Sequence, residues 1–318
     1  MPGLRRLRAR GMPGPRQEDD TVRILRTRPG RRRHAGRPRR RVQPGDGAKA
    51  AMASVLEPIY ERRFIFDSYA CRRGKGTDAA RDRAQEYLRR FEYCLKTDVV
   101  RFFPNVDHEV LLDVLDRRID DEPLRGLIRV ILASGEDILT DEATRDYFSG
   151  DDLFAALRPK GLPIGNLTSQ FFANVLLDTI DHFVKEELRV PGYVRYADDL
   201  LLFANTKADL WTIREALAER LAGIRLRLHA RKTQLHPCNA GVDFLGWKLS
   251  RNGRRLPQTA IARFNKRLRS MRWAYTRGDI TSGTISTSLR AWRAFAAAGN
   301  STGIRRALWR RVRFGPPR

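Results

Sequence analysis

From residue 53 to about residue 108 the chain alternates between helical and strand-like spacing of its apolar residues. Residues 53–65 predict a helix that Pro58 interrupts or kinks. The apolar positions of that helix are Val55, Leu56, Ile59 and Tyr60. An Ala-, Arg- and Leu-rich stretch then predicts a second helix that ends at about Arg90.

A strand pattern follows over residues 95–103, and it contains one carboxylate. Pro104 stops this pattern, and Asp107 is expected to cap a helix that starts at about His108. Asp98 lies among the apolar residues of the strand. Because an unpaired carboxylate in such a place is costly, Asp98 requires a cation nearby.

The remaining apolar periodicity predicts helices. Two of them span 124–132 and 171–188. Three Arg-rich helical runs close the chain, over 261–275, 285–298 and 304–314. The first of these runs interleaves basic and aromatic residues, a pattern typical of nucleic-acid binding.

The stretch 195–203 places two adjacent carboxylates between an aromatic residue and a run of large apolar residues. This pattern predicts a hairpin with buried strands whose tight turn carries Asp198 and Asp199. Mg²⁺ prefers a few carboxylate oxygens at about 2.0 to 2.1 Å and keeps its other positions for water and phosphate. Asp98 would supply a third acid, so the aspartates indicate phosphoryl-transfer chemistry.

Composition indicates a polyanionic partner. The 318 residues contain 62 Lys and Arg against 37 Asp and Glu, a formal charge of +25, which is the electrostatic footprint of a nucleic-acid binder. The cysteines, Cys71, Cys94 and Cys238, have no paired spacing, so neither a zinc site nor a disulfide framework is indicated. No apolar run is long enough to span a bilayer, and we expect a cytoplasmic protein with no membrane partner.

Residues 1–50 differ from the rest of the chain. Gly, Pro and Arg dominate this segment, which carries nearly half of the net positive charge and shows no helical or strand period. We therefore expect disorder. The segment is either a functional basic arm or a stretch of GC-rich DNA read out of frame.

A short basic loop precedes the second predicted helix. It contains Arg72, Arg73 and Lys75 together with Gly74 and Gly76. A flexible cationic loop in front of a helix N-terminus is suited to holding phosphates.

The order of these pieces resembles the successive blocks of a reverse transcriptase palm over roughly residues 53–315. The matching blocks are Asp98 with Phe102 and Phe103, Leu-Pro-Ile-Gly-Asn-Leu-Thr-Ser-Gln at 162–170, Tyr-Ala-Asp-Asp at 196–199, Lys232-Thr233, and Phe244-Leu245-Gly246-Trp247. Within that superfamily the chain looks most like the enzymes of bacterial and phage diversity-generating retroelements. Their signature has Ile-Gly-x-x-x-Ser-Gln where most relatives have Gln-Gly and Ser-Pro, and residues 67–76 resemble their second block.

The resemblance implies an α+β, right-hand fold. Residues 1–50 would form the disordered or out-of-frame segment, 51–97 a partial fingers region, and 98–250 a palm of antiparallel sheet and helices with returning fingers elements. Residues 251–318 would form a helical thumb that grips the duplex.

The resemblance also implies roles for single residues. Asp98, Asp198 and Asp199, with the backbone carbonyl of Val99, would hold two Mg²⁺ ions about 3.5 to 4 Å apart. These ions would activate the primer 3′ hydroxyl and neutralise the triphosphate and its leaving group. Lys232 would lie near that leaving group.

Further positions would contact the nucleotide or the primer. Phe103 would exclude ribonucleotides by a clash at the sugar C2′ position. Arg72, Lys75 and Gly165 complete the expected nucleotide-binding set together with Phe103, Ile164 and Lys232. The primer grip would be Phe244, Leu245, Gly246 and Trp247.

Ile164 distinguishes this chain from most relatives, which have Gln there. An Ile side chain offers no directional contact to the incoming nucleotide, so discrimination should be weaker. The function expected is therefore RNA-directed DNA synthesis that is error-prone opposite template adenine, copying a template-repeat RNA. The partners expected are an RNA template, a DNA or RNA primer, the cDNA product, dNTPs and a basic oligomeric accessory protein.

Two alternatives remain open. A retron or group II intron reverse transcriptase is disfavoured by Ile164 and Gln170 and by the lack of a maturase or endonuclease segment after the thumb. A catalytically impaired, N-terminally damaged nucleic-acid-binding remnant is the other. The reason for this second alternative is that the family's first fingers block is not found in the sequence. The Arg-rich run before Met52 occupies the place of that block. Nucleotide binding would then rest on Arg72, Arg73 and Lys75.

Overall fold

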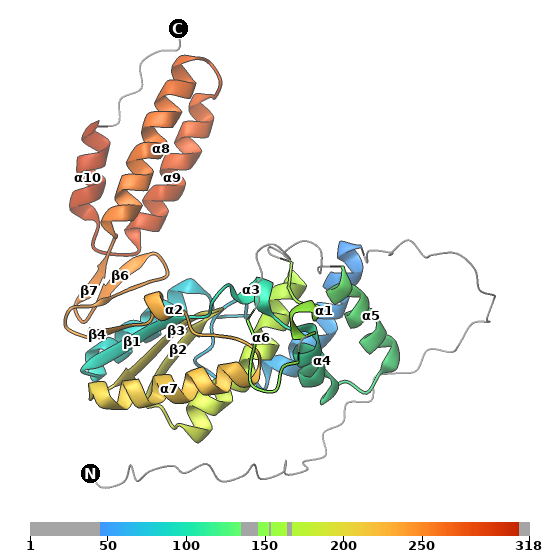
Figure 1. Ribbon diagram of the computed structural model, residues 1–318. Coiled ribbons are helices and arrows are strands. Elements are labelled where there is room, and N and C mark those ends of the chain that lie inside the picture. The colour runs from blue at the N-terminus through green and yellow to red at the C-terminus, as the bar shows by residue number, and fades with distance from the viewer. Residues whose placement is uncertain (1–44, 135–145, 153, 164–166, 312–318) are drawn as a thin grey trace.

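The computed structural model describes residues 45–134, 146–152, 154–163 and 167–311 of the chain. Most of the Arg-rich N-terminal segment, Ile164 and Gly165 therefore lie outside the described residues. The described part combines helices with two antiparallel sheets, which confirms the α+β class (Figure 1).

A four-stranded sheet forms the centre of the molecule. Its strands are β1 (Tyr93–Asp98), β2 (Gly192–Tyr196), β3 (Asp199–Ala204) and β4 (Gln234–Pro237), in the spatial order β2-β3-β1-β4. All neighbouring pairs are antiparallel. The central strand β1 thus lies beside a hairpin that is about a hundred residues away in the sequence.

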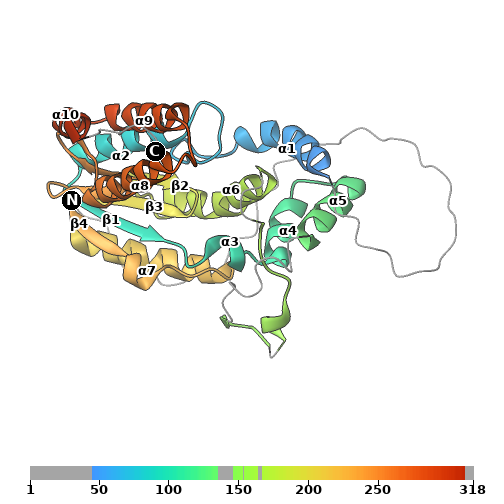
Figure 2. The same ribbon diagram turned by 90° about the horizontal axis from the view of Figure 1, so that it is seen from above.

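Helices cover both faces of this sheet, and this explains the nearly continuous apolar run of β3. Leu200 and Leu202 belong to the core on the side of α7 (Lys207–Gly223), whereas Leu201 and Phe203 belong to the core on the side of α2 (Thr77–Arg90). Seen from above, α2 and α7 lie on opposite sides of the sheet (Figure 2). Both sides of the hairpin are therefore held rigidly.

A second group of helices packs beyond the end of the sheet. The long helix α6 (Leu167–His182) contacts α1 (Asp46–Glu61) and α4 (His108–Asp116), and α4 also contacts α5 (Glu122–Ala133). Three short helical turns complete this region: η1 (Ala155–Leu157), the π-turn η2 (Phe183–Glu187) and α3 (Phe102–Asn105). Asp107 caps α4, as predicted, because its carboxylate accepts from the Glu109 and Val110 amides at 2.9 and 3.2 Å.

Three predicted boundaries differ from the structure. The strand predicted over 95–103 ends at Asp98, because Arg101 takes a left-handed conformation (φ +41°) and starts the turn α3. The helix predicted over 171–188 begins at Leu167, and its α-helical part ends at His182, where the π-turn follows. The first helix begins at Asp46 and keeps Pro58 inside it.

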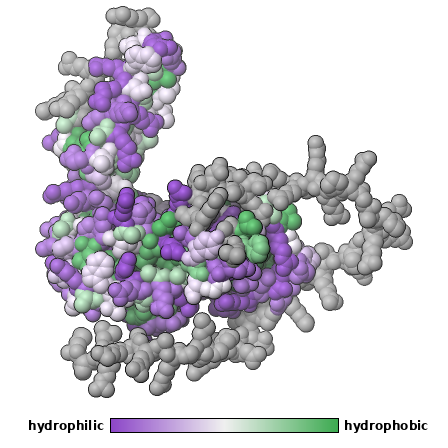
Figure 3. Space-filling model, in the orientation of Figure 1, coloured by the Kyte–Doolittle hydropathy of each residue, from purple (hydrophilic) through white to green (hydrophobic). Residues whose placement is uncertain are grey.

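The C-terminal part forms a small sheet and a helical arm. The sheet consists of β5 (Val242–Phe244), β6 (Trp247–Ser250) and β7 (Gly253–Arg255). The arm consists of α8 (Gln258–Thr276), α9 (Ser282–Ala297) and α10 (Thr302–Arg311), and it stands away from the central sheet (Figure 1). Hydrophilic residues cover most of its visible surface (Figure 3). Among the described residues, no helix combines the length and the apolar character that a membrane crossing needs.

Candidate active site

The central sheet brings the three predicted aspartates to one end. Asp98 is the last residue of β1 and lies opposite Asp199, the first residue of β3. Tyr196 pairs with Asp199 and closes a two-residue turn formed by Ala197 and Asp198. We call residues 196–199 the acidic turn. Antiparallel pairing thus places carboxylates from two distant segments side by side.

These carboxylates are partly removed from water and close to one another. Burial, and after it the Asp98 carboxylate, raises the pKa of Asp198 to about 6. Burial also raises the pKa of Asp199, an effect that the Lys96 ammonium opposes. Such a cluster of buried acids is unfavourable by itself and is stabilised by a nearby cation.

Lys232 brings the positive charge nearest to Asp98. It ends the short turn η3 (Ala230–Lys232), and the next residue, Thr233, is hydrogen-bonded through its hydroxyl to the Thr97 hydroxyl at 2.8 Å. The Lys232 ammonium donates to Asp98 Oδ2, and this hydrogen bond raises the pKa of the lysine. Lys232 therefore keeps its charge at the site at neutral pH.

The acids offer a partial fit to a divalent cation. Asp98 Oδ1 is buried and has no hydrogen-bond partner among the described residues, which is the state expected of an oxygen that binds a metal ion. No group of three or more His, Cys, Asp or Glu side chains is already arranged around a metal position within the described ranges. A complete ligand set thus requires the Lys232 ammonium to give way and backbone or nucleotide oxygens to contribute.

The backbone after β1 offers one candidate for such an oxygen, the carbonyl of Val99. The Val100 amide donates to the Arg227 carbonyl at 2.8 Å, and the His229 amide donates to the Asp98 carbonyl at 2.7 Å. The backbone groups of successive residues in an extended segment point to opposite sides. Because Asp98 and Val100 bond to residues 227–229 on one side, the Val99 carbonyl points to the other side. That edge is the one along which β3 and the acidic turn lie.

The raised pKa of Asp198 predicts a pH-dependent stability. Its folded pKa of about 6 exceeds the ordinary value of 3.8, so its favourable contribution is complete below pH 3.8 and is lost as the pH rises through 6. Without divalent metal at pH 7.5, Asp198→Asn should therefore raise the melting temperature by about 2 to 4 °C, the shift for about 1 kcal/mol. Thermal unfolding in EDTA at pH 4.5 and 7.5 measures this, and an equal effect at both pH values would contradict it.

The expected nucleotide-binding residues are arranged in different ways. Phe103 is half-buried in α3, packs edge-on against Phe102 with ring centroids 5.3 Å apart, and accepts at its carbonyl from the Leu162 amide at 2.8 Å. Its side chain thus belongs in part to the core. The structure does not describe Ile164 and Gly165.

The basic loop is held by contacts within the protein. Arg72 has a side chain only 4% exposed, forms an ion pair with Glu61 at 2.7 Å and donates to the Ile65 and Ser68 carbonyls. Lys75 donates to the Phe66 carbonyl at 2.9 Å and lies over the Phe66 ring, and burial lowers its pKa. Arg72 therefore fixes the loop, and Lys75 lies nearer to the surface.

The predicted primer grip is a hairpin turn. Phe244 and Trp247 pair at the ends of β5 and β6 and are buried in the core under α2. Leu245 (φ +46°) and Gly246 (φ +80°) form the turn between them. Only these two turn residues are accessible, so Phe244 and Trp247 can act on a primer only by supporting them.

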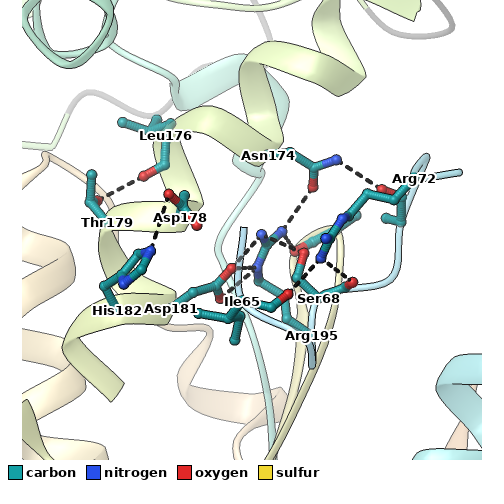
Figure 4. Close-up of polar contacts among 12 residues, drawn as sticks. Ile65, Ser68, Arg72, Asn174, Leu176, Asp178, Thr179, Asp181, His182 and Arg195 are labelled. Carbon is teal, nitrogen blue, oxygen red and sulfur yellow. Dashed lines mark hydrogen bonds and ion pairs between the residues drawn. The ribbon is translucent and has the colours of Figure 1, made fainter. Parts of the chain in front are cut away.

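Sequence patterns did not reveal the charged network beneath the acidic turn. Arg195 on β2 and Asp181 on α6 are both fully buried and form an ion pair at 2.6 Å (Figure 4). Asn174 and Ser68 bond to the same guanidinium. The one sequence signal was a basic residue and an acidic residue, each within an otherwise apolar element. Nothing in the local sequence indicates that these two elements pack against each other.

Comparisons with known proteins show which proteins this chain is similar to. A family described as reverse transcriptase (RNA-dependent DNA polymerase) matches residues 47–249. Protein YkfC of Escherichia coli (strain K12) is 26% identical over 271 residues, which cover 70% of this chain and 68% of that protein. A putative COX1/OXI3 intron 2 protein of Saccharomyces cerevisiae is 23% identical over 200 residues, covering 62% of this chain but 21% of the yeast protein.

Solved structures of telomerase are also similar to the chain. Apo telomerase from Candida tropicalis matches with a TM-score of 0.48 and 13% identity, over 68% of this chain and 41% of that one. Telomerase from Candida albicans in complex with a telomeric RNA fragment matches with a TM-score of 0.45 and 13% identity, over 73% of this chain and 41% of that one.

Proposed function

The chain belongs to the reverse transcriptase (RNA-dependent DNA polymerase) family, and we propose that it synthesises cDNA on an RNA template and that it does so with errors because Ile164 stands where most relatives have Gln. The observation that carries the proposal is the convergence of Asp98 with Asp198 and Asp199 at one end of the central sheet. Family membership supplies the reaction class, and this convergence supplies a site with the charge that the reaction needs.

The residues proposed to hold divalent metal are Asp98, Asp198, Asp199 and the carbonyl of Val99. Two Mg²⁺ ions bound there would supply activation of the primer 3′ hydroxyl and neutralisation of the triphosphate. Lys232 would have a different role. When its protonated ammonium is no longer bound to Asp98, that ammonium would neutralise the charge of the departing pyrophosphate. Phe103 would lie against the sugar, and the turn at Leu245 and Gly246 against the primer.

The direct test is primer extension by the full chain on an RNA template with dNTPs. We expect extension that requires Mg²⁺ and stops with EDTA. Purified, folded protein that extends no primer on RNA under any divalent metal would refute the proposal and favour a nucleic-acid-binding remnant.

We further propose that the enzyme belongs to a diversity-generating retroelement. Ile164, within the run that ends in Ser169 and Gln170, supports this assignment because that group has the same residues there. A template-repeat RNA would then be the template, and a basic oligomeric accessory protein would assist. A pair of near-identical DNA repeats close to the gene that differ at adenines would support the assignment.

Ile164→Gln should raise fidelity opposite template adenine. An amide can hydrogen-bond where Ile offers only apolar surface, and one hydrogen bond of about 1 kcal/mol corresponds to a three- to tenfold change in misincorporation. Single-nucleotide extension opposite each template base measures the effect. Leu167→Gln, at a 53% exposed position nearby, is the matched control and should leave fidelity unchanged. Equal misincorporation opposite adenine in wild type and Ile164→Gln would count against this role.

A second candidate is a reverse transcriptase of the group II intron type. The observation that favours it is the similarity to a yeast protein named for an intron. High fidelity opposite template adenine in the wild-type enzyme, with no nearby adenine-variant repeat, would favour this candidate over the retroelement.

A further inference from the structure

Arg195 lies directly beneath the acidic turn and makes every hydrogen bond that its side chain can make. It is fully buried on β2, two residues before Ala197. A guanidinium has five N–H donors. Nε donates to Asp181 at 2.7 Å, Nη1 donates to Asn174 Oδ1 at 3.1 Å and to the Ala197 carbonyl at 3.3 Å, and Nη2 donates to Ser68 Oγ at 3.0 Å and to Asp181 at 2.6 Å. No donor is left over for a substrate.

The contact with Ala197 concerns the residue that precedes Asp198. Ala197 has φ +52°, a left-handed conformation that costs an L-residue about 1 to 2 kcal/mol. Such conformations persist only where the surroundings fix them. The Arg195 guanidinium accordingly holds the Ala197 carbonyl from below, and the direction of the following carboxylate depends on that carbonyl.

The same arginine joins the acidic turn to the chain that precedes the basic loop. β2 is an edge strand, and residues 67–69 pair along its free side. The Arg195 amide donates to the Asp67 carbonyl at 2.9 Å, and the Tyr69 amide donates to the Arg195 carbonyl at 3.0 Å. Asn174 extends the connection from α6, because its amide donates to the Ala70 carbonyl at 2.8 Å (Figure 4).

We propose that Arg195, held by Asp181, is a positioning residue that fixes the acidic turn in the conformation in which Asp198 binds metal. This inference rests on the proposed polymerase function. Arg195 acts through the Ala197 carbonyl and touches neither substrate nor metal.

The chemistry of the Arg195–Asp181 ion pair favours a positioning role over a role in stabilising the fold alone. A buried ion pair is often no more stabilising than apolar residues of the same volume, so stability alone gives little reason for it. An Arg fork, in contrast, can hold several acceptors at fixed angles, which a Lys ammonium cannot do. The specific need is therefore the simultaneous hold on Asp181, Ser68 and Ala197.

The test compares Mn²⁺ binding by wild type, Arg195→Lys and Ser68→Ala, measured by electron paramagnetic resonance on the full chain without nucleic acid. Arg195→Lys keeps a positive charge beside Asp181 but loses the fork. It should weaken Mn²⁺ binding by about tenfold or more, the usual effect of losing a residue that orients a ligand. Ser68→Ala removes one acceptor and keeps the strand pairing, so it should cause a smaller loss in the same direction.

Arg225→Lys is the matched control. Arg225 forms ion pairs with Asp107 at 2.9 Å and Glu109 at 3.2 Å, away from the acidic turn. This variant should lose stability without losing Mn²⁺ affinity, and thermal unfolding reports the stability of all four proteins. Primer extension should then show a raised Mg²⁺ requirement for Arg195→Lys and an unchanged one for Arg225→Lys.

Mn²⁺ affinities of folded Arg195→Lys and Ser68→Ala equal to that of wild type would overturn the inference. If Arg195→Lys does not fold, unchanged affinity in Ser68→Ala overturns it and weakened affinity supports it. Wild-type protein that binds Mn²⁺ but extends no primer would refute the proposed function, and the Mn²⁺ comparison would still decide the role of Arg195.

Discussion

Asp198→Asn is expected to reduce primer extension by at least about a thousandfold while leaving the fold intact. Asparagine has the same shape but cannot supply an anionic oxygen, and a lost metal contact is worth several kcal/mol of transition-state stabilisation, at 1.36 kcal/mol for each tenfold in rate. The substitution also relieves the burial of a charge beside Asp98, so the metal-free variant should be at least as stable as wild type. Single-turnover extension on an RNA template measures the rate.

The control for this prediction removes a carboxylate elsewhere. Glu215→Gln changes the net charge by the same amount on the exposed side of α7 and should leave the rate unchanged. Full activity in a folded Asp198→Asn protein would show that the acidic turn is not the polymerase site. Loss of activity together with unfolding would contradict the expected stability.

Gly299→Ala is expected to loosen the helical arm and lower the free energy of unfolding by about 1 to 3 kcal/mol, the usual cost of overpacking. A Cβ at Gly299 would meet the ring of Trp247 and, at 2.9 Å, the carbonyl oxygen of Arg254. Trp247 is fully buried and packs against Phe295 with ring centroids 5.2 Å apart, so the ring has little room to move. The neighbouring Asn300 amide donates to the same Arg254 carbonyl at 2.8 Å.

Two measurements check this effect. Thermal unfolding should show a melting temperature lower by about 3 to 10 °C, and binding of an RNA–DNA duplex should weaken if the arm is the duplex-gripping thumb that the family resemblance implies. Gly303→Ala is the matched control, because it lies in α10 with open space around its Cβ position. It should be neutral or slightly stabilising, since Ala is the better helix former. An unchanged melting temperature in Gly299→Ala would contradict the prediction, because it would mean that Trp247 and the Arg254 carbonyl can move to accommodate the added methyl group.

Much of the candidate site follows from local patterns. The acids followed by four large apolar residues predict the hairpin and its turn, and the capping Asp107 predicts the start of α4. The position of Asp98 within an apolar strand also predicts that it needs a cation, and the Lys232 ammonium lies against it. Such features are predictable because side-chain periodicity and capping depend on neighbours within a few residues.

Other features required distant segments to meet. Arg72, expected to bind nucleotide, has a buried side chain that Glu61 and two carbonyls hold. Trp247, expected in the primer grip, lies on the small sheet and is buried between α2 and the arm. The local sequence around a basic or aromatic loop residue does not reveal whether its side chain faces solvent or is buried in the core.

The sequence by itself indicated most of the helices, the hairpin of the acidic turn, the strongly positive charge and the candidate acids, because these depend on composition and short-range spacing. Only the tertiary structure decided which charges are buried together. Strand pairing places Asp98 beside Asp199, two like charges that together need a cation, and the fold joins Arg195 to Asp181, whose opposite charges compensate each other in the core. A buried charge must find its partner wherever the fold supplies one, and no local pattern records that distance.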